Sequence, residues 1–173
     1  VDPDAAVRRV ALRSAAAILG TSLPGRPLET ALGRLARDTH TSLRERIAAI
    51  DTMGQLRVAS VVPILVGLLG AFPDDVGESA RRALLVVTRQ DFARDPQRWT
   101  EWWSKNESRH RIEWLIDALM HDTQSIRRAA GDELKQLTKE YFGYYDDLPK
   151  RERERAQERY REWWEREGRS RFR

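Results

Sequence analysis

The chain repeats one apolar pattern at an offset of 50 residues, between residues 76–92 and residues 126–142. The aligned pairs are Val76 with Ile126, Ala80 with Ala130, Leu84 with Leu134, Val87 with Leu137, Thr88 with Thr138 and Phe92 with Phe142. The first four positions of each copy are spaced by four, four and three residues, as on one face of an α-helix. Such a helix buries its apolar face only against a neighbour, so the repeat predicts helices stacked side by side.

Apolar residues recur at three- and four-residue steps along the chain, and the alternation typical of strands is nearly absent. The sequence therefore predicts an all-α fold. Glycines, prolines and capping residues divide it. We expect helices over residues 4–19, 27–38, 42–54, 60–70, 75–90, 96–105, 109–120, 123–140 and 150–167.

Two similar hexapeptides, RWTEWW at 98–103 and RYREWW at 159–164, follow the two copies of the repeat. Each places aromatic residues at i, i+3 and i+4, on one helical face. We expect an added helix after each copy, with its aromatic face wedged into the stack. Phe92 precedes Trp99 by 7 residues and Phe142 precedes Tyr160 by 18, so the second helix is expected to be a longer copy, with part of the 11 extra residues in the loop GYYDDL.

Three segments of the chain resemble HEAT repeats. They are VRRVA at 7–11, RIAAIDTMG at 46–54 with VVPILVGLL at 61–69, and DTQSIRRAAGDEL at 122–134. The resemblance implies antiparallel helix pairs stacked into a right-handed solenoid, with second helices lining a concave face. It also implies an Asp and Arg ladder, for which Asp75 with Arg81 and Asp122 with Arg128 are the candidates.

From these patterns we expect an all-α, right-handed α-solenoid of about four HEAT-like hairpins with two inserted Trp-Trp helices. Residues 1–148 would form the solenoid, 149–168 a C-terminal capping helix and 169–173 a basic tail. The chain begins with Val1 and not Met, so we expect a fragment of a longer protein.

The net charge of +4 is confined to the last 25 residues. Residues 1–148 hold 21 basic and 21 acidic side chains, so the expected solenoid is neutral. The absence of cysteine excludes disulfides and thiolate chemistry. No apolar run is long enough to span a bilayer and no signal peptide is visible, so we expect a cytoplasmic protein.

Two kinds of residue are candidates for partner binding. Neighbouring tryptophans point about 100° apart on a helix, so one residue of each Trp pair would be half exposed. The candidates are Trp103 in the first pair and Trp164 in the second. Arginines on the second helices would line the concave face, and these are Arg8, Arg44, Arg46, Arg81, Arg82, Arg127 and Arg128.

The function expected from this pattern is a non-catalytic protein–protein interaction scaffold. The alternative is a nucleic-acid binder of the DNA glycosylase-like HEAT type, using the arginines on its concave face. Relatives of HEAT proteins also include bilin lyases, for which no residue specifically argues. Paired arginines would favour the scaffold, whereas unpaired arginines on one face would favour DNA.

Neither an enzyme nor a cofactor is expected. The chain has no phosphate loop, dinucleotide fingerprint or serine elbow. Its histidines, His40, His110 and His121, form no metal-ligand cluster, although Asp117 and His121 are at chelating helical spacing. A capping role for His121 is the favoured interpretation.

Overall fold

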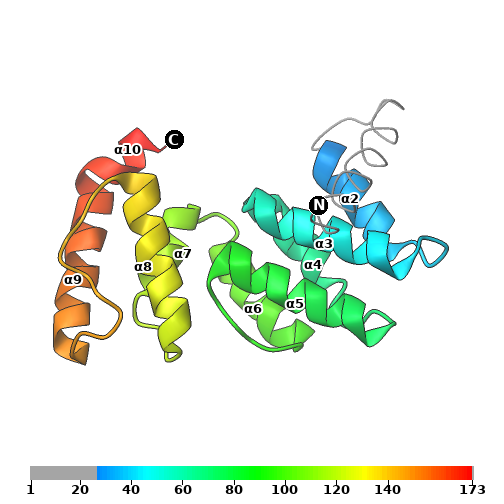
Figure 1. Cartoon of the computed structure of the whole chain (residues 1–173). Helices are drawn as coiled ribbons and strands as arrows, with labels where there is room; N and C mark the ends of the chain where they lie inside the picture. Colours follow the sequence, from blue (N-terminus) through cyan, green and yellow to red (C-terminus); the bar gives the residue numbers. More distant parts are fainter. Residues whose placement is uncertain (1–26, 173) are drawn as a thin grey trace, which may run out of the picture. The chain divides into compact units, whose positions relative to one another are not determined.

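The computed structural model describes residues 27–172, and every regular element in this range is a helix (Figure 1). The predicted all-α fold is therefore confirmed for this part of the chain. The helix expected over residues 4–19, the HEAT-like segment at 7–11 and the candidate Arg8 lie outside it.

The helices follow the expected boundaries closely, except over residues 60–70. They are α2 (Pro27–Arg37), α3 (Leu43–Leu56), η1 (Ala59–Val61), α4 (Val62–Val66), α5 (Asp74–Thr88), α6 (Pro96–Asn106), α7 (Arg111–Ala118), α8 (Gln124–Thr138), α9 (Lys150–Trp163), η2 (Trp164–Gly168) and α10 (Arg169–Arg171). The element η1 is a 3₁₀ turn and η2 is a π-helical turn.

The single helix expected over residues 60–70 is divided. A 3₁₀ turn leads into α4, which has Pro63 in its first turn, and residues 67–70 form turns. Gly67 and Gly70 explain the early end, because glycine disfavours an α-helix by about 1 kcal/mol relative to alanine. Five apolar residues of this segment are nevertheless buried, namely Val61, Val62, Leu65, Leu68 and Leu69.

The described chain falls into two compact units. The first comprises residues 27–87 and 91–107, and the second comprises residues 88–90 and 108–172. In the first unit α2 packs against α3 and α4 against α6, and in the second α7 packs against both α8 and α9.

The 50-residue repeat holds in the structure: the first copy lies in the first unit except for residues 88–90, and the second copy lies in the second unit. Of the six aligned pairs, three are fully or almost fully buried in both copies through aliphatic side chains, and Thr88 and Thr138 are also fully buried. Each threonine hydroxyl accepts a hydrogen bond from the backbone N–H two residues later, at 3.1 Å. The intervening residues, Arg89 and Lys139, both adopt a left-handed conformation that ends the helix.

One pair of the repeat differs. Val87 is fully buried, whereas Leu137 is 45% exposed. The sequence alignment predicts two core positions, and the structure shows only one.

The loop after each copy is tied to the preceding turn at equivalent places. Arg94 Nε donates to the carbonyl of Leu69 at 2.9 Å, and Tyr144 Oη donates to the carbonyl of Leu119 at 2.6 Å. Both donors and both acceptors are related by the same offset of 50. A glycine leaves the space for each donor, because a Cβ at Gly77 would lie 2.5 Å from Arg94 and one at Gly131 would lie 2.9 Å from Tyr144.

Each Trp-bearing helix is fixed by the phenylalanine that ends its repeat. Phe92 meets Trp99 edge to face at a centroid distance of 4.9 Å, and Phe142 meets Tyr160 in the same way at 4.7 Å. Trp99 and Tyr160 are both buried. The equivalent contacts confirm that α9 is a longer copy of α6 and that the first aromatic residue is a wedge.

The 11 extra residues of the second copy divide between loop and helix. Phe92 precedes the helix-starting Pro96 by 4 residues, and Phe142 precedes Pro149 by 7. From those prolines to Trp99 and Tyr160 the distances are 3 and 11 residues. Because α6 begins at Pro96 whereas α9 begins at Lys150, one residue after Pro149, the helix takes seven of the added residues and the loop takes four.

The second unit ends in the π-helical turn η2. A Cβ on Gly168 would lie 2.4 Å from the ring of Trp164, so only glycine fits at this position without a shift of that ring. The turn brings Phe172 against Trp163 and Trp164, at centroid distances of 6.2 and 6.5 Å. The segment expected as a basic tail thus begins as helix α10.

Candidate functional site

Arg46, predicted to face a partner, is instead a buried structural residue. Its Nε donates to the carbonyl of Ala36 at 2.9 Å and its Nη1 to the carbonyl of Phe72 at 3.1 Å. Only 5% of the residue is exposed. The prediction for Arg46 is wrong because backbone carbonyls from two other segments draw the guanidinium inward.

Arg81 forms ion pairs, but not with the predicted Asp75. Its guanidinium contacts Asp91 at 2.6 Å and Glu78 at 3.1 Å. The hydrogen bond to Asp91 is the main cause of its raised pKa. The ladder pair predicted from the HEAT resemblance is wrong, because Asp91 in the following loop lies within reach of Arg81.

The other two candidates in the first unit are exposed. Arg82 Nη2 donates to the buried Ser79 Oγ at 2.8 Å, so it is partly committed to its own helix. Arg44 lies exposed on the first turn of α3.

In the second unit, Arg127 and Arg128 both hold the loop that precedes α9. Arg127 donates to the carbonyls of His121 and Asp122, each at 2.7 Å, and to that of Asp146 at 3.1 Å. Arg128 pairs with the Asp146 carboxylate at 3.2 Å. The predicted pair of Asp122 with Arg128 is therefore wrong.

The tryptophan candidates differ from each other. Trp103 is half-buried, together with Trp102. Trp164 is only 3% exposed because Phe172 and the π-helical turn cover it, so its predicted exposure is wrong. The indole N–H groups of Trp163 and Trp164 are buried and have no acceptor within the described residues.

A buried ionic triad in the second unit escaped the sequence analysis. The Glu133 carboxylate forms ion pairs with the guanidinium groups of Arg89, at 3.0 Å, and Arg111, at 2.7 Å. All three side chains are almost buried. Burial, the largest single cause, acts to raise the pKa of Glu133. The hydrogen bonds and charges of Arg111 and Arg89 together outweigh burial, so the pKa is lowered. The position aligned with Glu133 in the first copy is Ala83. This difference between the two copies was the one sequence signal that could have indicated a special role for Glu133.

Two tyrosines of the loop before α9 form an exposed pair. Tyr141 is 46% and Tyr145 60% exposed, and their rings meet edge to face at 6.0 Å. Lys135 Nζ lies 5.0 Å from the centre of the Tyr141 ring. The hydrogen bond between the two hydroxyls raises the pKa of Tyr141. We call Tyr141 and Tyr145 the tyrosine pair.

Hydrogen bonds hold the loop that carries the tyrosine pair. Tyr144 between them points inward, and burial raises its pKa to about 12. Asp146 accepts hydrogen bonds from Gln124 and Arg128. A small hollow of about 70 Å³ lies beside the pair and reaches Gly131 and Tyr160.

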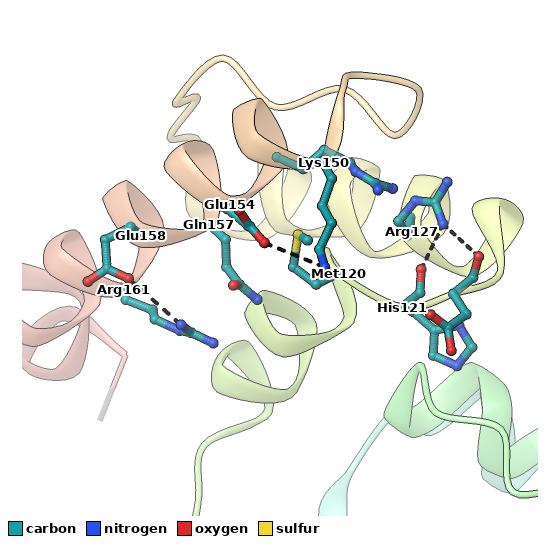
Figure 2. A pocket seen from close by; sticks show the side chains of 10 residues that line it. Met120, His121, Arg127, Lys150, Glu154, Gln157, Glu158 and Arg161 are labelled. Atoms are coloured by element: carbon teal, nitrogen blue, oxygen red, sulfur yellow. Dashed lines mark hydrogen bonds and ion pairs between the residues drawn. The ribbon is translucent and has the colours of Figure 1, made fainter.

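A second surface feature of this unit is an open groove of about 600 Å³ along α9, which we call the α9 groove. Figure 2 shows Lys150, Gln157 and Arg161 extending from α9 toward the chain around Met120. Gln157 is held in place because its Nε2 donates to the carbonyl of Ile116 at 2.8 Å. The lining residues are Met120, His121, Asp122, Arg127, Lys150, Arg153, Glu154, Gln157, Glu158 and Arg161.

The histidines of the second unit act as backbone acceptors. His110 Nδ1 accepts from the N–H of Ile112 at 3.2 Å and caps α7, while His121 Nδ1 accepts from Thr123 at 3.0 Å. Asp117 pairs with Arg109 and Arg161. Within residues 27–172, no group of three or more His, Asp or Glu side chains is arranged to hold a metal ion.

No helix of residues 27–172 combines the length and apolar character needed to cross a lipid bilayer. Comparisons of the chain with protein-family models, with curated proteins and with solved structures find no match.

Proposed function

We propose that this protein is a non-catalytic protein-binding scaffold and that the tyrosine pair is one of its contact surfaces. The observation that supports the proposal most directly is the exposure of two neighbouring aromatic rings on a loop held by hydrogen bonds of Tyr144 and Asp146. Tyrosine is enriched in binding hot spots because a rigid ring buries a large area at low entropic cost.

Engagement of the arginines supports the scaffold over the nucleic-acid alternative. Arg46, Arg81 and Arg127 use their guanidinium groups on carbonyls or carboxylates of their own unit. Phosphate binding would require these groups to exchange existing partners for a phosphate oxygen. Among the candidates within residues 27–172, Arg44, Arg82 and Arg128 are exposed, and Arg128 is paired with Asp146.

The proposal includes the HEAT-like organisation expected from the sequence, a right-handed solenoid built from helix pairs. Packing of α2 on α3 and of α7 on α8 supplies such pairs, and the 50-residue repeat supplies the regularity that a solenoid needs.

The experiment replaces Tyr145 with a photo-crosslinking phenylalanine derivative in the full chain. Crosslinked partners from cells of the source organism are compared with those obtained from the same derivative at Lys105, an exposed position on α6. We expect one or more proteins to crosslink at Tyr145 alone and to be lost when Tyr141 is also changed to alanine.

Crosslinks that are identical at positions 145 and 105, or that persist in the Tyr141→Ala variant, would contradict the tyrosine pair as a contact surface. Crosslinking to nucleic acid at position 145, with binding that falls steeply as salt rises, would support the alternative function.

A further inference from the structure

Arg153 is the one cation of the α9 groove whose side chain has no hydrogen bond or ion pair with any residue from 27 to 172. Its Nε is buried and without an acceptor. The other cations are engaged: Arg127 on three carbonyls, Arg161 on Asp117 at 3.3 Å, and Lys150 on Glu154 at 3.9 Å.

An arginine in this situation favours an anionic ligand. No carboxylate or carbonyl of residues 27–172 engages this guanidinium, so its two terminal nitrogens can donate to a ligand oxygen. The planar fork of the guanidinium matches the two oxygens of a carboxylate. Arg153 therefore has both the charge and the geometry to receive a carboxylate.

The neighbouring charges strengthen this preference at one end of the groove. Lys150 lies one turn before Arg153 on α9, and its pair with Glu154 is long. The carboxylate of Glu158 is already beside Arg161, at 3.7 Å. The end of the groove around Arg153 and Lys150 is thus positive.

The length of the groove indicates an extended ligand. It follows α9 from Lys150 to Arg161, a span of about 16 Å at 1.5 Å per helical residue. An extended peptide of about five residues covers this distance at about 3.3 Å per residue. A free inorganic anion would occupy only the positive end.

We propose that the α9 groove binds an extended acidic segment of another protein, with a side-chain carboxylate on Arg153. The segment would run past Gln157 and Met120 toward Arg161. This inference rests on the proposed protein-binding function, but it concerns a different surface from the tyrosine pair.

The test measures binding of a fluorescein-labelled, end-blocked peptide Gly-Asp-Glu-Asp-Gly to the full chain by fluorescence polarisation. The amide peptide Gly-Asn-Gln-Asn-Gly is the chemical control. Arg153→Ala should weaken binding of the acidic peptide about 10-fold, as expected for loss of one charge-assisted hydrogen-bonded pair. Arg155→Ala removes an exposed α9 arginine that does not line the groove and should change binding less than about twofold.

The two methionines of the chain give an independent location of the bound peptide. Met120 lines the groove, whereas Met53 is fully buried in the first unit. With ¹³C-labelled methionine methyl groups, the peptide should shift the Met120 NMR signal and leave the Met53 signal unchanged. The same shift should persist in the double variant Tyr141→Ala, Tyr145→Ala, which separates this site from the proposed contact surface.

Equal loss of affinity in Arg153→Ala and Arg155→Ala, or an unshifted Met120 signal at saturating peptide, would overturn the inference. Succinate and phosphate are the competing small anions. If either shifts Met120 and displaces the peptide at equal concentration, the groove is a small-anion site and the assignment of a peptide is wrong.

Discussion

At the residue scale, the most consequential contact is the buried triad of Glu133 with Arg89 and Arg111. Substitution Glu133→Gln removes the carboxylate charge that two nearly buried guanidinium groups contact. We expect it to lower the free energy of unfolding by about 3 kcal/mol, measured by urea denaturation. Glu154→Gln, at an exposed 3.9 Å pair, should cost less than about 0.5 kcal/mol.

His110 provides a prediction about pH. His110 is exposed at the surface, yet partial desolvation of its imidazole, the largest cause, lowers its pKa; Arg111 lowers it further, while Glu113 opposes the shift. The unfolded chain therefore binds a proton more readily, so stability decreases as pH falls below the ordinary histidine pKa of about 6.5. Protonation of Nδ1 would also remove the acceptor for Ile112 N–H.

We expect the melting temperature to fall between about pH 7.5 and pH 5, and part of that fall to disappear in His110→Asn. Asparagine keeps a capping acceptor at the start of α7 but does not titrate. Identical pH profiles for the two proteins would show that His110 has no role in the pH dependence.

At the element scale, the junction of α8 with the loop after it depends on Gly131. Tyr144 lies where a Cβ would be, and its hydroxyl is fixed to the Leu119 carbonyl, so the ring cannot easily move away. Gly131→Ala should destabilise the protein by about 1 kcal/mol despite the better helix propensity of alanine. Gly70→Ala, in the turn after α4, is the control for an unobstructed methyl group, since no atom lies within 4 Å of the added Cβ. Thermal melting compares the two, and a more stable Gly131→Ala variant would contradict the expected clash.

The helices and the repeat could be predicted from the sequence because spacing, proline starts and glycine stops are local signals. The ion-pair partners of Arg81 and Arg128 could not be predicted, because they depend on which carboxylates the fold brings close. The repeat pattern indicated Asp75 and Asp122, whereas the observed partners are Asp91 and Asp146. The burial of Trp164 could not be predicted either, because it depends on the π-helical turn η2, which brings Phe172 against the Trp164 ring. Arg153 carries no distinguishing sequence signal among the arginines of α9.

At the scale of the whole molecule, the proposed solenoid predicts an elongated particle. A compact single domain of 173 residues has a radius of gyration of about 16 Å. We expect small-angle X-ray scattering of the monomeric chain to give a larger value and an asymmetric distance distribution. A value near 16 Å with a symmetric distribution would contradict the solenoid.

The unequal lengths of α6 and α9 carry a practical consequence. Both helices are in register at the aromatic residue that meets Phe92 or Phe142, and α9 has seven more residues than α6 before that contact. The start of each Trp-bearing helix is therefore the place where we expect added residues, or a grafted epitope, to leave the contact between the phenylalanine and the aromatic residue of that helix intact.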